Sequence, residues 1–384
     1  MTKGSPLPSH SNAPLSPHPL LPYGWDETYA ERFRPLAEQG CLPGRIVRVD
    51  RGRVDAVVPD GDGVRTVLAG TAQVATGGPL RVPCTGDWAA VDLTGGRTHE
   101  GLDGIVRCLL ERRTAFVRST SSKRSEAQVL AANVDFALIA VALGGEFDLG
   151  RVERFLSLAW SSGAQPVVVL TKADLVPDPV TLAQLTADAE ASAPGAPVAA
   201  VSAGTGAGVP ELASVVAGGT SVLLGQSGAG KSTLANALTG TGSQYVAAVR
   251  DRDGKGRHTT TTRDLLPLPT GGVLIDTPGL RGVGLWDAED GLGRTFAEIE
   301  ELAERCRFHD CGHTAEPDCA VTAAVEDGTL PHRRLESYRK LLRENARIAA
   351  RSDARLRAER KQQAKRQQAL GRHLAERKRG QYRR

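Results

Sequence analysis

The stretch Gly225-Gln226-Ser227-Gly228-Ala229-Gly230-Lys231-Ser232 has the pattern Gly-x-x-x-x-Gly-Lys-Ser of a phosphate-binding loop. A short apolar run, 221–224, precedes it, and helix-favouring sequence, 233–238, follows it. The glycines let consecutive backbone N–H groups face a phosphate, and the N-terminus of the helix adds partial positive charge. The alternative is an ordinary glycine-rich turn, but a pattern eight positions long between a strand and a helix favours a nucleotide-binding protein.

A second motif downstream, Asp276-Thr277-Pro278-Gly279, is typical of a sensor for magnesium and the γ-phosphate. We expect Asp276 to contact Mg²⁺ through water and the Gly279 N–H to face the γ-phosphate. In the phosphate loop, Lys231 should reach the β- and γ-phosphates and Ser232 should bind Mg²⁺. The residues expected to contact phosphate or magnesium are Gly225, Gln226, Ser227, Gly228, Ala229, Gly230, Lys231, Ser232, Thr233, Asp276 and Gly279.

Thr171-Lys172-Ala173-Asp174 follows a buried-strand pattern and indicates guanine recognition. The Asp174 carboxylate can accept both N1–H and N2–H₂ of guanine, a pair of donors that adenine lacks. Lys172 can lay its aliphatic stem against the base. The alternative for Asp174 is a helix cap, which it could be as well. At the end of the next strand, Ser202 and Ala203 are expected to offer backbone N–H groups to the guanine O6.

The order of these motifs along the chain is unusual. Base recognition, at 171–174 and 202–203, precedes the phosphate loop at 225, which in turn precedes Asp276. In an ordinary small GTPase the phosphate loop comes first. Strands alternate with helices through this region, a pattern that predicts a doubly wound parallel sheet. We therefore expect a circularly permuted GTPase domain over 117–290.

The chain before this domain differs from it in composition and in its predicted secondary structure. Residues 1–40 are expected to form a flexible Pro-, Ser- and His-rich extension, which ends in a short helical lead-in at 23–39. Short alternating strands with Gly- and Asp-rich turns follow over 41–116, which predicts a small β-barrel. A five-stranded OB-type barrel fits this length. A generic barrel that binds no RNA remains the alternative.

After the GTPase domain, Cys306-x4-Cys311-x-His313-x5-Cys319 offers three thiolates and one imidazole. Four such ligands complete a tetrahedral structural zinc site and leave no open position for catalysis. The alternative is a chance cluster of free thiols beside a histidine. We expect a zinc-binding helical domain over 291–345, with Cys306, Cys311, His313 and Cys319 as its ligands.

The charge of the chain is unevenly distributed. The last 54 residues hold 19 Lys and Arg against 5 Asp and Glu, whereas the rest of the chain has a net charge of −10. The basic extension, 346–384, indicates a polyanionic partner such as RNA; its alternative is a solvated helix face. No apolar run approaches the ~20 residues of a membrane span, and the N-terminus lacks the apolar segment of a signal peptide. We expect a cytoplasmic protein with no membrane partner.

Together these motifs resemble the ribosome small subunit-dependent GTPase A family, circularly permuted GTPases of bacterial ribosome biogenesis. The resemblance rests on the zinc pattern and on TKAD (171–174), GQSGAGKS (225–232), GKGRHTTTT (254–262) and DTPG (276–279), and it runs from about Pro43 to Leu342. It implies GTP hydrolysis with Mg²⁺ during late maturation of the small ribosomal subunit, stimulated by that subunit. It also implies that the barrel and the zinc domain contact ribosomal RNA.

The resemblance further implies a role in hydrolysis for His258. Leu280, not Gln, follows Gly279, so His258 could orient the attacking water instead. One threonine of the run 259–262 is expected to complete Mg²⁺ coordination, and the family pattern favours Thr260. The expected catalytic set is thus His258, Lys231 and Thr260, in a protein expected to be a monomer. The alternative function is a GTP-timed RNA-binding scaffold or checkpoint that acts on another structured RNA.

Overall fold

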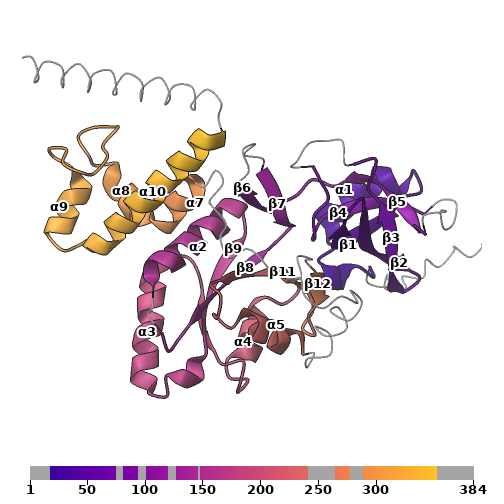
Figure 1. Ribbon diagram of the computed structural model, residues 1–384, viewed down its shortest axis with the longest axis horizontal. Helices are drawn as coiled ribbons and strands as arrows, with labels where there is room; N and C mark the ends of the chain where they lie inside the picture. Colours follow the sequence, from indigo (N-terminus) through magenta and orange to yellow (C-terminus); the bar gives the residue numbers. More distant parts are fainter. Residues whose placement is uncertain are drawn as a thin grey trace, which may run out of the picture.

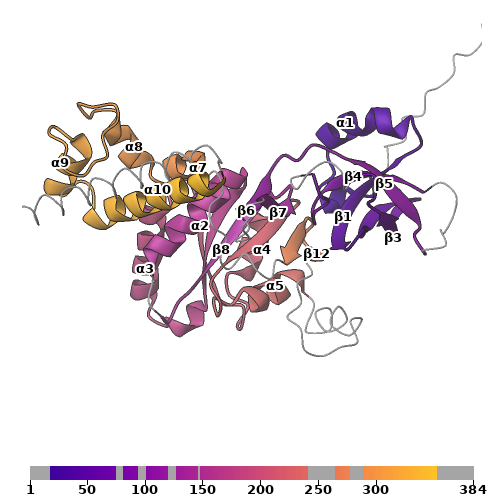
Figure 2. The same ribbon diagram turned by 45° about the horizontal axis from the view of Figure 1, so that its top comes forward.

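A computed structural model shows a β-barrel, a central α/β sheet and a C-terminal group of helices, which follow one another along the chain (Figure 1). The structure describes residues 18–74, 81–93, 101–119, 127–145, 148–240, 264–276 and 289–352. Figure 2 shows the barrel and the C-terminal helices at opposite ends of the central sheet. Among the described residues, no helix has the length and apolar character needed to cross a membrane.

The barrel is closed by five strands in the order β1-β2-β3-β5-β4, as expected for an OB-type fold. Its core consists of buried Val, Ile and Ala side chains, which come from all five strands. Parallel pairing of β3 with β5 closes the barrel, whereas the other pairs are antiparallel. The strands are β1 (Leu42–Asp50), β2 (Arg53–Asp60), β3 (Gly63–Gly70), β4 (Trp88–Asp92) and β5 (Gly104–Leu109).

A short helix packs on the outside of the barrel. The 3₁₀ turn η1 (Leu21–Tyr23) leads into α1 (Glu27–Ala37), whose N-cap Asp26 accepts a hydrogen bond from the Tyr29 N–H at 3.0 Å. Trp25, Tyr29 and Phe33 lie on one side of this segment and pack with the fully buried Trp88 of β4. The aromatic cluster therefore fixes the lead-in helix to the barrel.

The central sheet has six strands in the order β10-β9-β8-β11-β13-β12; the first five are parallel and β12 is antiparallel. The sheet is doubly wound as expected, because alternate residues of one strand face different cores. Leu138 packs with α4 and α5, whereas Ile139 packs with α2. The strands are β8 (Phe136–Ala142), β9 (Gln165–Thr171), β10 (Val198–Val201), β11 (Thr220–Gly225), β12 (Asp264–Pro267) and β13 (Val273–Asp276). The helices are α2 (Leu149–Ser162), η2 (Ala173–Leu175), α3 (Pro179–Ser192), α4 (Val209–Val215) and α5 (Lys231–Thr239).

A two-stranded hairpin, β6 (Ala115–Ser119) and β7 (Ala127–Ala132), joins the barrel to the sheet. The domain boundary expected between residues 116 and 117 falls inside β6, and the last barrel strand ends at Leu109. After the sheet come α7 (Glu289–Thr295), α8 (Ala297–Ala303), α9 (Ala320–Glu326) and α10 (His332–Ser352). Helix α7 crosses α2 closely, since a Cβ on Gly291 would lie 2.1 Å from the Ser157 carbonyl oxygen.

Buried polar contacts join the barrel to the sheet. The Arg45 guanidinium of β1 donates to the Thr220 hydroxyl at 2.9 Å and to the Asn133 carbonyl at 3.3 Å. The Asn133 side chain, from a residue with φ of 53°, accepts from the Tyr29 hydroxyl at 3.0 Å and donates to the Gly86 carbonyl at 2.9 Å. Complete burial lowers the pKa of Arg45 to about 10. Because Thr220 begins the strand that leads to the phosphate loop, these bonds fix the barrel relative to the nucleotide site.

A second buried network holds α10 against α2, and both views show these helices side by side (Figure 1; Figure 2). Arg334 of α10 donates to Glu153 of α2 at 2.8 Å and to Glu298 of α8 at 2.7 Å. Glu153 is fully buried and also accepts from Arg333 at 2.8 Å. A buried carboxylate needs such partners, because an unpaired buried charge is strongly unfavourable.

Replacing Arg334 by Met should lower the thermal unfolding midpoint by several degrees, because Glu153 and Glu298 lose their buried partner. Removing one member of a buried ion pair costs about 3–5 kcal/mol. Arg333→Met is the matched control, since the Arg333 side chain is 44% exposed and the Arg334 side chain only 5%. Calorimetry should show a much smaller shift for Arg333→Met, and equal shifts would contradict a central role for Arg334.

Candidate nucleotide and metal sites

The phosphate loop lies between β11 and α5, in the strand-loop-helix context expected from the sequence. Three of its glycines have positive φ angles: 135° at Gly225, 81° at Gly228 and 78° at Gly230. A Cβ at position 225 would lie 2.5 Å from the Ala140 carbonyl oxygen, so the loop can leave the sheet at this point only with glycine. The loop therefore has the backbone conformation that lets N–H groups surround a phosphate.

Lys231 begins α5, and its ammonium group folds back over the loop. Its Nζ donates to the Gly225 carbonyl at 2.8 Å and also to the Gln226 carbonyl. Ser232 and Thr233 follow in the first helical turn and are exposed to solvent. The ammonium group and the two hydroxyls thus gather at the N-terminus of a helix, where an anion is favoured.

Thr171 connects the base-recognition segment to the phosphate loop. It is buried at the end of β9, and its hydroxyl donates to the Ala229 carbonyl of the loop at 2.8 Å. The sequence placed Thr171 in the segment expected to recognise guanine, but it did not indicate this contact. The Thr171 hydroxyl thus joins the two segments. The only sign of this contact in the sequence is a polar side chain at the end of a strand.

The expected guanine-binding residues lie together where β9 and β10 end. Asp174 is in η2 and exposed, and its Oδ1 accepts from the Ser202 hydroxyl at 2.5 Å. Lys172 is also exposed and has a φ of 58°, while Ala203 follows Ser202 and is half-buried. Because β9 and β10 are adjacent and parallel, the two motifs meet at one edge of the sheet. The sequence predicted a backbone role for Ser202 and missed its side-chain contact with Asp174.

Asp276 is exposed at the end of β13, which pairs with the phosphate-loop strand β11. Opposite it in the register lies Asp264 of β12, whose carboxylate is 4.0 Å from Arg48 of the barrel. Burial is the main cause of the raised pKa of Asp264, which Arg48 partly offsets and Asp276 reinforces. The other three residues expected in the nucleotide site, His258, Thr260 and Gly279, lie outside the described residues.

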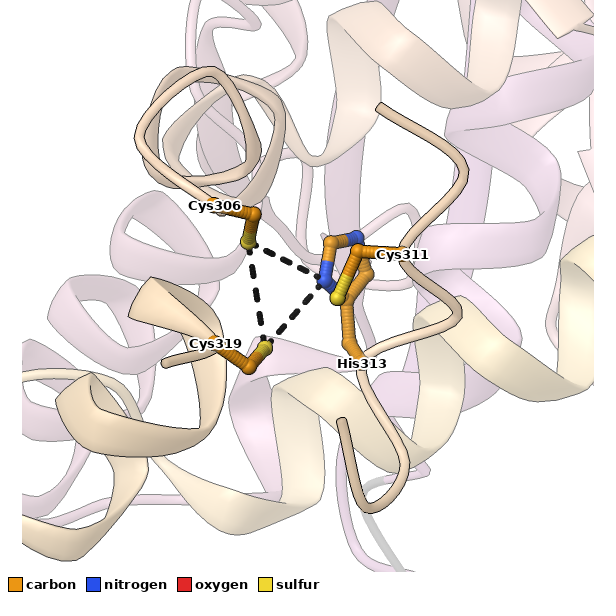
Figure 3. Close-up of side chains that lie close together, drawn as sticks. All are labelled: Cys306, Cys311, His313 and Cys319. Carbon is orange, nitrogen blue, oxygen red and sulfur yellow. Dashed lines mark hydrogen bonds between the residues drawn. The ribbon is translucent and has the colours of Figure 1, made fainter. Parts of the chain in front are cut away.

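Cys306, Cys311, His313 and Cys319 converge in the C-terminal domain, and all four of their ligand atoms lie within 4.8 Å of one another (Figure 3). The Cys306 Sγ is 3.8 Å from the Cys319 Sγ and 3.6 Å from the His313 Nδ1, and the Cys319 Sγ is 3.5 Å from the same nitrogen. Sulfur and nitrogen ligands at about 2.3 and 2.1 Å from a tetrahedral zinc ion would be about 3.6–3.8 Å apart. The cluster therefore fits one zinc ion.

The thiols of this cluster do not ionise equally. Burial and the neighbouring sulfurs raise the pKa of Cys311 to about 11. Burial also acts to raise the pKa of Cys319, but hydrogen bonds from Thr322 and His313 outweigh it and lower that pKa to about 6. A divalent cation bound by these sulfurs would favour the thiolate form of each cysteine.

A carboxylate outside the cluster organises the loop between His313 and Cys319. Glu316 accepts backbone N–H groups from Gly312 at 3.0 Å, Thr314 at 2.7 Å and Ala315 at 3.0 Å. These bonds lower the pKa of Glu316 to about 2. The sequence did not identify Glu316 as a supporting residue, because an acidic residue in a loop has no distinctive pattern.

We expect the purified protein to contain one zinc ion per chain by elemental analysis. Cys306→Ser should lose most of it and should increase hydrogen exchange across 304–326, because structural zinc contributes directly to folding. Cys108→Ser, in the barrel, is the matched control and should retain the metal. A metal-free wild type, or full zinc content in Cys306→Ser, would contradict the assignment.

The comparisons with known proteins agree with this geometry. A sequence model described as RsgA GTPase matches residues 109–286. The small ribosomal subunit biogenesis GTPase RsgA of Streptomyces coelicolor is 63% identical over 372 residues, which cover 97% of this chain and 98% of the relative. The protein of the same name from Streptomyces avermitilis is also 63% identical, over 96% of each chain.

Two solved structures share the architecture. YjeQ from Thermotoga maritima is 27% identical and has a TM-score of 0.57, covering 80% of this chain and 99% of that chain. YloQ, described as a circularly permuted GTPase, is 26% identical and has a TM-score of 0.58, with coverages of 80% and 95%. The circular permutation expected from the motif order is thereby confirmed.

Proposed function

The chain belongs to the RsgA GTPase family and is a GTP hydrolase, and from this premise we propose that it acts on the small ribosomal subunit during late maturation, with hydrolysis stimulated by that subunit. The main support is the 63% identity, over nearly the full chain, to relatives named for small ribosomal subunit biogenesis. The arrangement at the carboxyl ends of the parallel strands agrees with a GTP site, since the motifs expected to bind guanine and phosphate meet there. The alternative, a checkpoint on another structured RNA, is not favoured by these relatives.

In the proposed site, guanine lies against Thr171, Lys172, Asp174, Ser202 and Ala203. The Asp174 carboxylate accepts the two donors of the base, and the Ser202 hydroxyl, 2.5 Å from Asp174 Oδ1, holds that carboxylate in place. This second contact restricts the rotation of Asp174, which reduces the entropy cost when the base binds. The restricted carboxylate is therefore the main determinant of guanine specificity.

The phosphates are assigned to the loop from Gly225 to Gly230, together with Lys231 and Thr233. Mg²⁺ is assigned to the hydroxyls of Ser232 and Thr260, with Asp276 acting through water and the Gly279 N–H facing the γ-phosphate. When bound, Mg²⁺ neutralises charge on the phosphate oxygens. Lys231 stabilises the charge that develops on the β–γ bridge, and His258 orients the attacking water.

The zinc ion is proposed to be structural, because all four positions around it are taken by protein ligands. It fixes the loops between α8 and α9, while Tyr338 of α10 lies against His313 with a ring separation of 6.5 Å. The metal thus supports the folded C-terminal domain and takes no part in hydrolysis. We further propose that the protein is a cytoplasmic monomer.

The proposal is tested by sedimentation with separated ribosomal subunits. In the presence of a non-hydrolysable GTP analogue, the protein should pellet with small subunits and not with large ones. GDP should release it, since the nucleotide state controls the affinity for the subunit. Equal binding to both subunits, or equal binding in GDP and in the GTP analogue, would argue against the proposed role.

Deleting 353–384 should weaken subunit binding and reduce its dependence on salt. This segment contains 12 Lys and Arg against 3 Asp and Glu. For each phosphate that the segment neutralises, its deletion should lower the slope of log K against log salt concentration by about 0.7–0.9. Fluorescence titrations at several salt concentrations measure this slope, and an unchanged slope would mean that the segment binds no RNA phosphates.

A further inference from the structure

A cavity of about 600 Å³ lies between the phosphate loop, α2 and α10. Its lining includes Gln226 and Ser227 of the loop, Arg151 and Arg154 of α2, and Ser337 and Lys340 of α10. Volumes of about 300–1,000 Å³ are typical of ligand sites. The cavity thus places side chains of the C-terminal helix beside the loop proposed to bind GTP.

The position of Lys231 shows which end of the nucleotide site this cavity adjoins. A phosphate-loop lysine reaches the β- and γ-phosphates. The Lys231 ammonium group lies at the first two residues of the loop, bonded to the carbonyls of Gly225 and Gln226. Gln226 and its neighbour Ser227 line the cavity. The cavity therefore opens at the γ-phosphate end of the site, away from Asp174 and the base.

Three cations line the cavity, and two of them have carboxylate partners. Arg151 lies 3.3 Å from Asp148, and Arg154 pairs with Glu344 of α10. Lys340 is exposed and makes no ion pair with any residue in the described part of the chain. Its ammonium group is thus available to an anion, whereas the two guanidinium groups are already partly neutralised.

Helix α10 is held firmly enough to position this lysine. The buried contacts from Arg334 to Glu153 and Glu298 fix the helix less than two turns before Lys340. The pair of Arg154 with Glu344 fixes it one turn after Lys340. Lys340 therefore projects from a segment that is anchored to α2 on both sides, which reduces the cost of holding its charge near the loop.

We propose that Lys340 extends through this cavity to the γ-phosphate of GTP and acts as a cation supplied in cis by the C-terminal domain. The inference rests on the proposed assignment of the phosphate loop to GTP. The ammonium group keeps its proton and pairs with a γ-phosphate oxygen, so it favours GTP over GDP. It also stabilises the charge on the transferred group, as a cis arginine does in other GTPases.

The test measures affinities for GDP and for a non-hydrolysable imido analogue of GTP, in the absence of ribosomes. Lys340→Met should weaken binding of the analogue about tenfold and leave GDP binding within twofold, because GDP lacks the γ-phosphate. Lys340→Arg should retain most of the affinity, since it keeps the charge. Arg347→Met is the matched control: it removes one charge from the same helix face two turns further on and should change neither affinity.

Equal loss for both nucleotides, or no loss for the analogue in Lys340→Met, would overturn the inference. So would a loss of the same size in Arg347→Met, because that would indicate a general effect of charge. These outcomes are separate from the proposed function: the wild type can bind GTP and respond to small subunits whether or not Lys340 contributes.

Discussion

Asp174→Asn should exchange guanine specificity for xanthine specificity, with GDP affinity falling a hundredfold or more. In the proposed site the carboxylate accepts two donors from guanine, and hydrogen bonds to a charged group contribute about 1.5–3 kcal/mol each. An asparagine amide presents one acceptor and one donor, which complement N1–H and the 2-oxo group of xanthine. When the donors and acceptors of a binding side chain do not match those of a base, the site discriminates against that base by orders of magnitude in affinity.

The measurement is a competition between GDP and xanthosine diphosphate for the variant and the wild type. Asp178→Asn is the matched control. Asp178 lies four residues later and caps α3, accepting the Thr181 N–H at 2.9 Å, so its loss should not alter the choice of base. A variant at Asp174 that loses GDP and gains no affinity for xanthosine diphosphate would point to a structural role for the carboxylate.

His258→Ala should lower GTP turnover on the small subunit by about 10²–10³-fold, within the range of general acid–base contributions. The substitution removes the side chain proposed to orient water and leaves the phosphate loop and base site complete. GTP affinity should therefore stay within about twofold of the wild type. Single-turnover hydrolysis with saturating small subunits measures the rate, and equilibrium titration measures the affinity.

Lys231→Ala provides the contrast, because its ammonium group contacts the loop itself at Gly225. The Lys231→Ala substitution should weaken nucleotide binding as well as hydrolysis. If His258→Ala weakened binding as much as Lys231→Ala does, its role would be in folding or binding and not in orienting water. A stimulated rate unchanged in His258→Ala would remove it from the catalytic set.

The sequence predicted those parts of the fold that depend on local pattern. The phosphate loop, the segment 171–174 and the cysteine cluster each involve residues that are close in sequence. The type and order of these residues were therefore sufficient to predict that each set would lie together. The closed barrel and the doubly wound sheet followed from strand spacing and from the alternation of strands with helices. The antiparallel edge strand β12 was not expected, since its four residues show no strong periodicity.

Contacts between distant segments could not be predicted. Arg45 and Thr220 are 175 residues apart, and Glu153 and Arg334 are 181 residues apart. Nothing in the sequence distinguishes these arginines from exposed ones, because their burial depends on how the domains pack. For the same reason the sequence showed Lys340 only as one of the many cations among the last 54 residues, and the role proposed for it depends on the cavity that it lines with Ser227.

The most direct test of the central claim is multiple-turnover GTP hydrolysis by the wild-type protein with separated ribosomal subunits. We expect a slow intrinsic rate that purified small subunits raise many-fold and that large subunits leave unchanged. The His258→Ala protein should bind the same small subunits without this increase. A rate that small subunits do not alter, measured where GTP binding is confirmed, would contradict a GTPase that acts on the small ribosomal subunit.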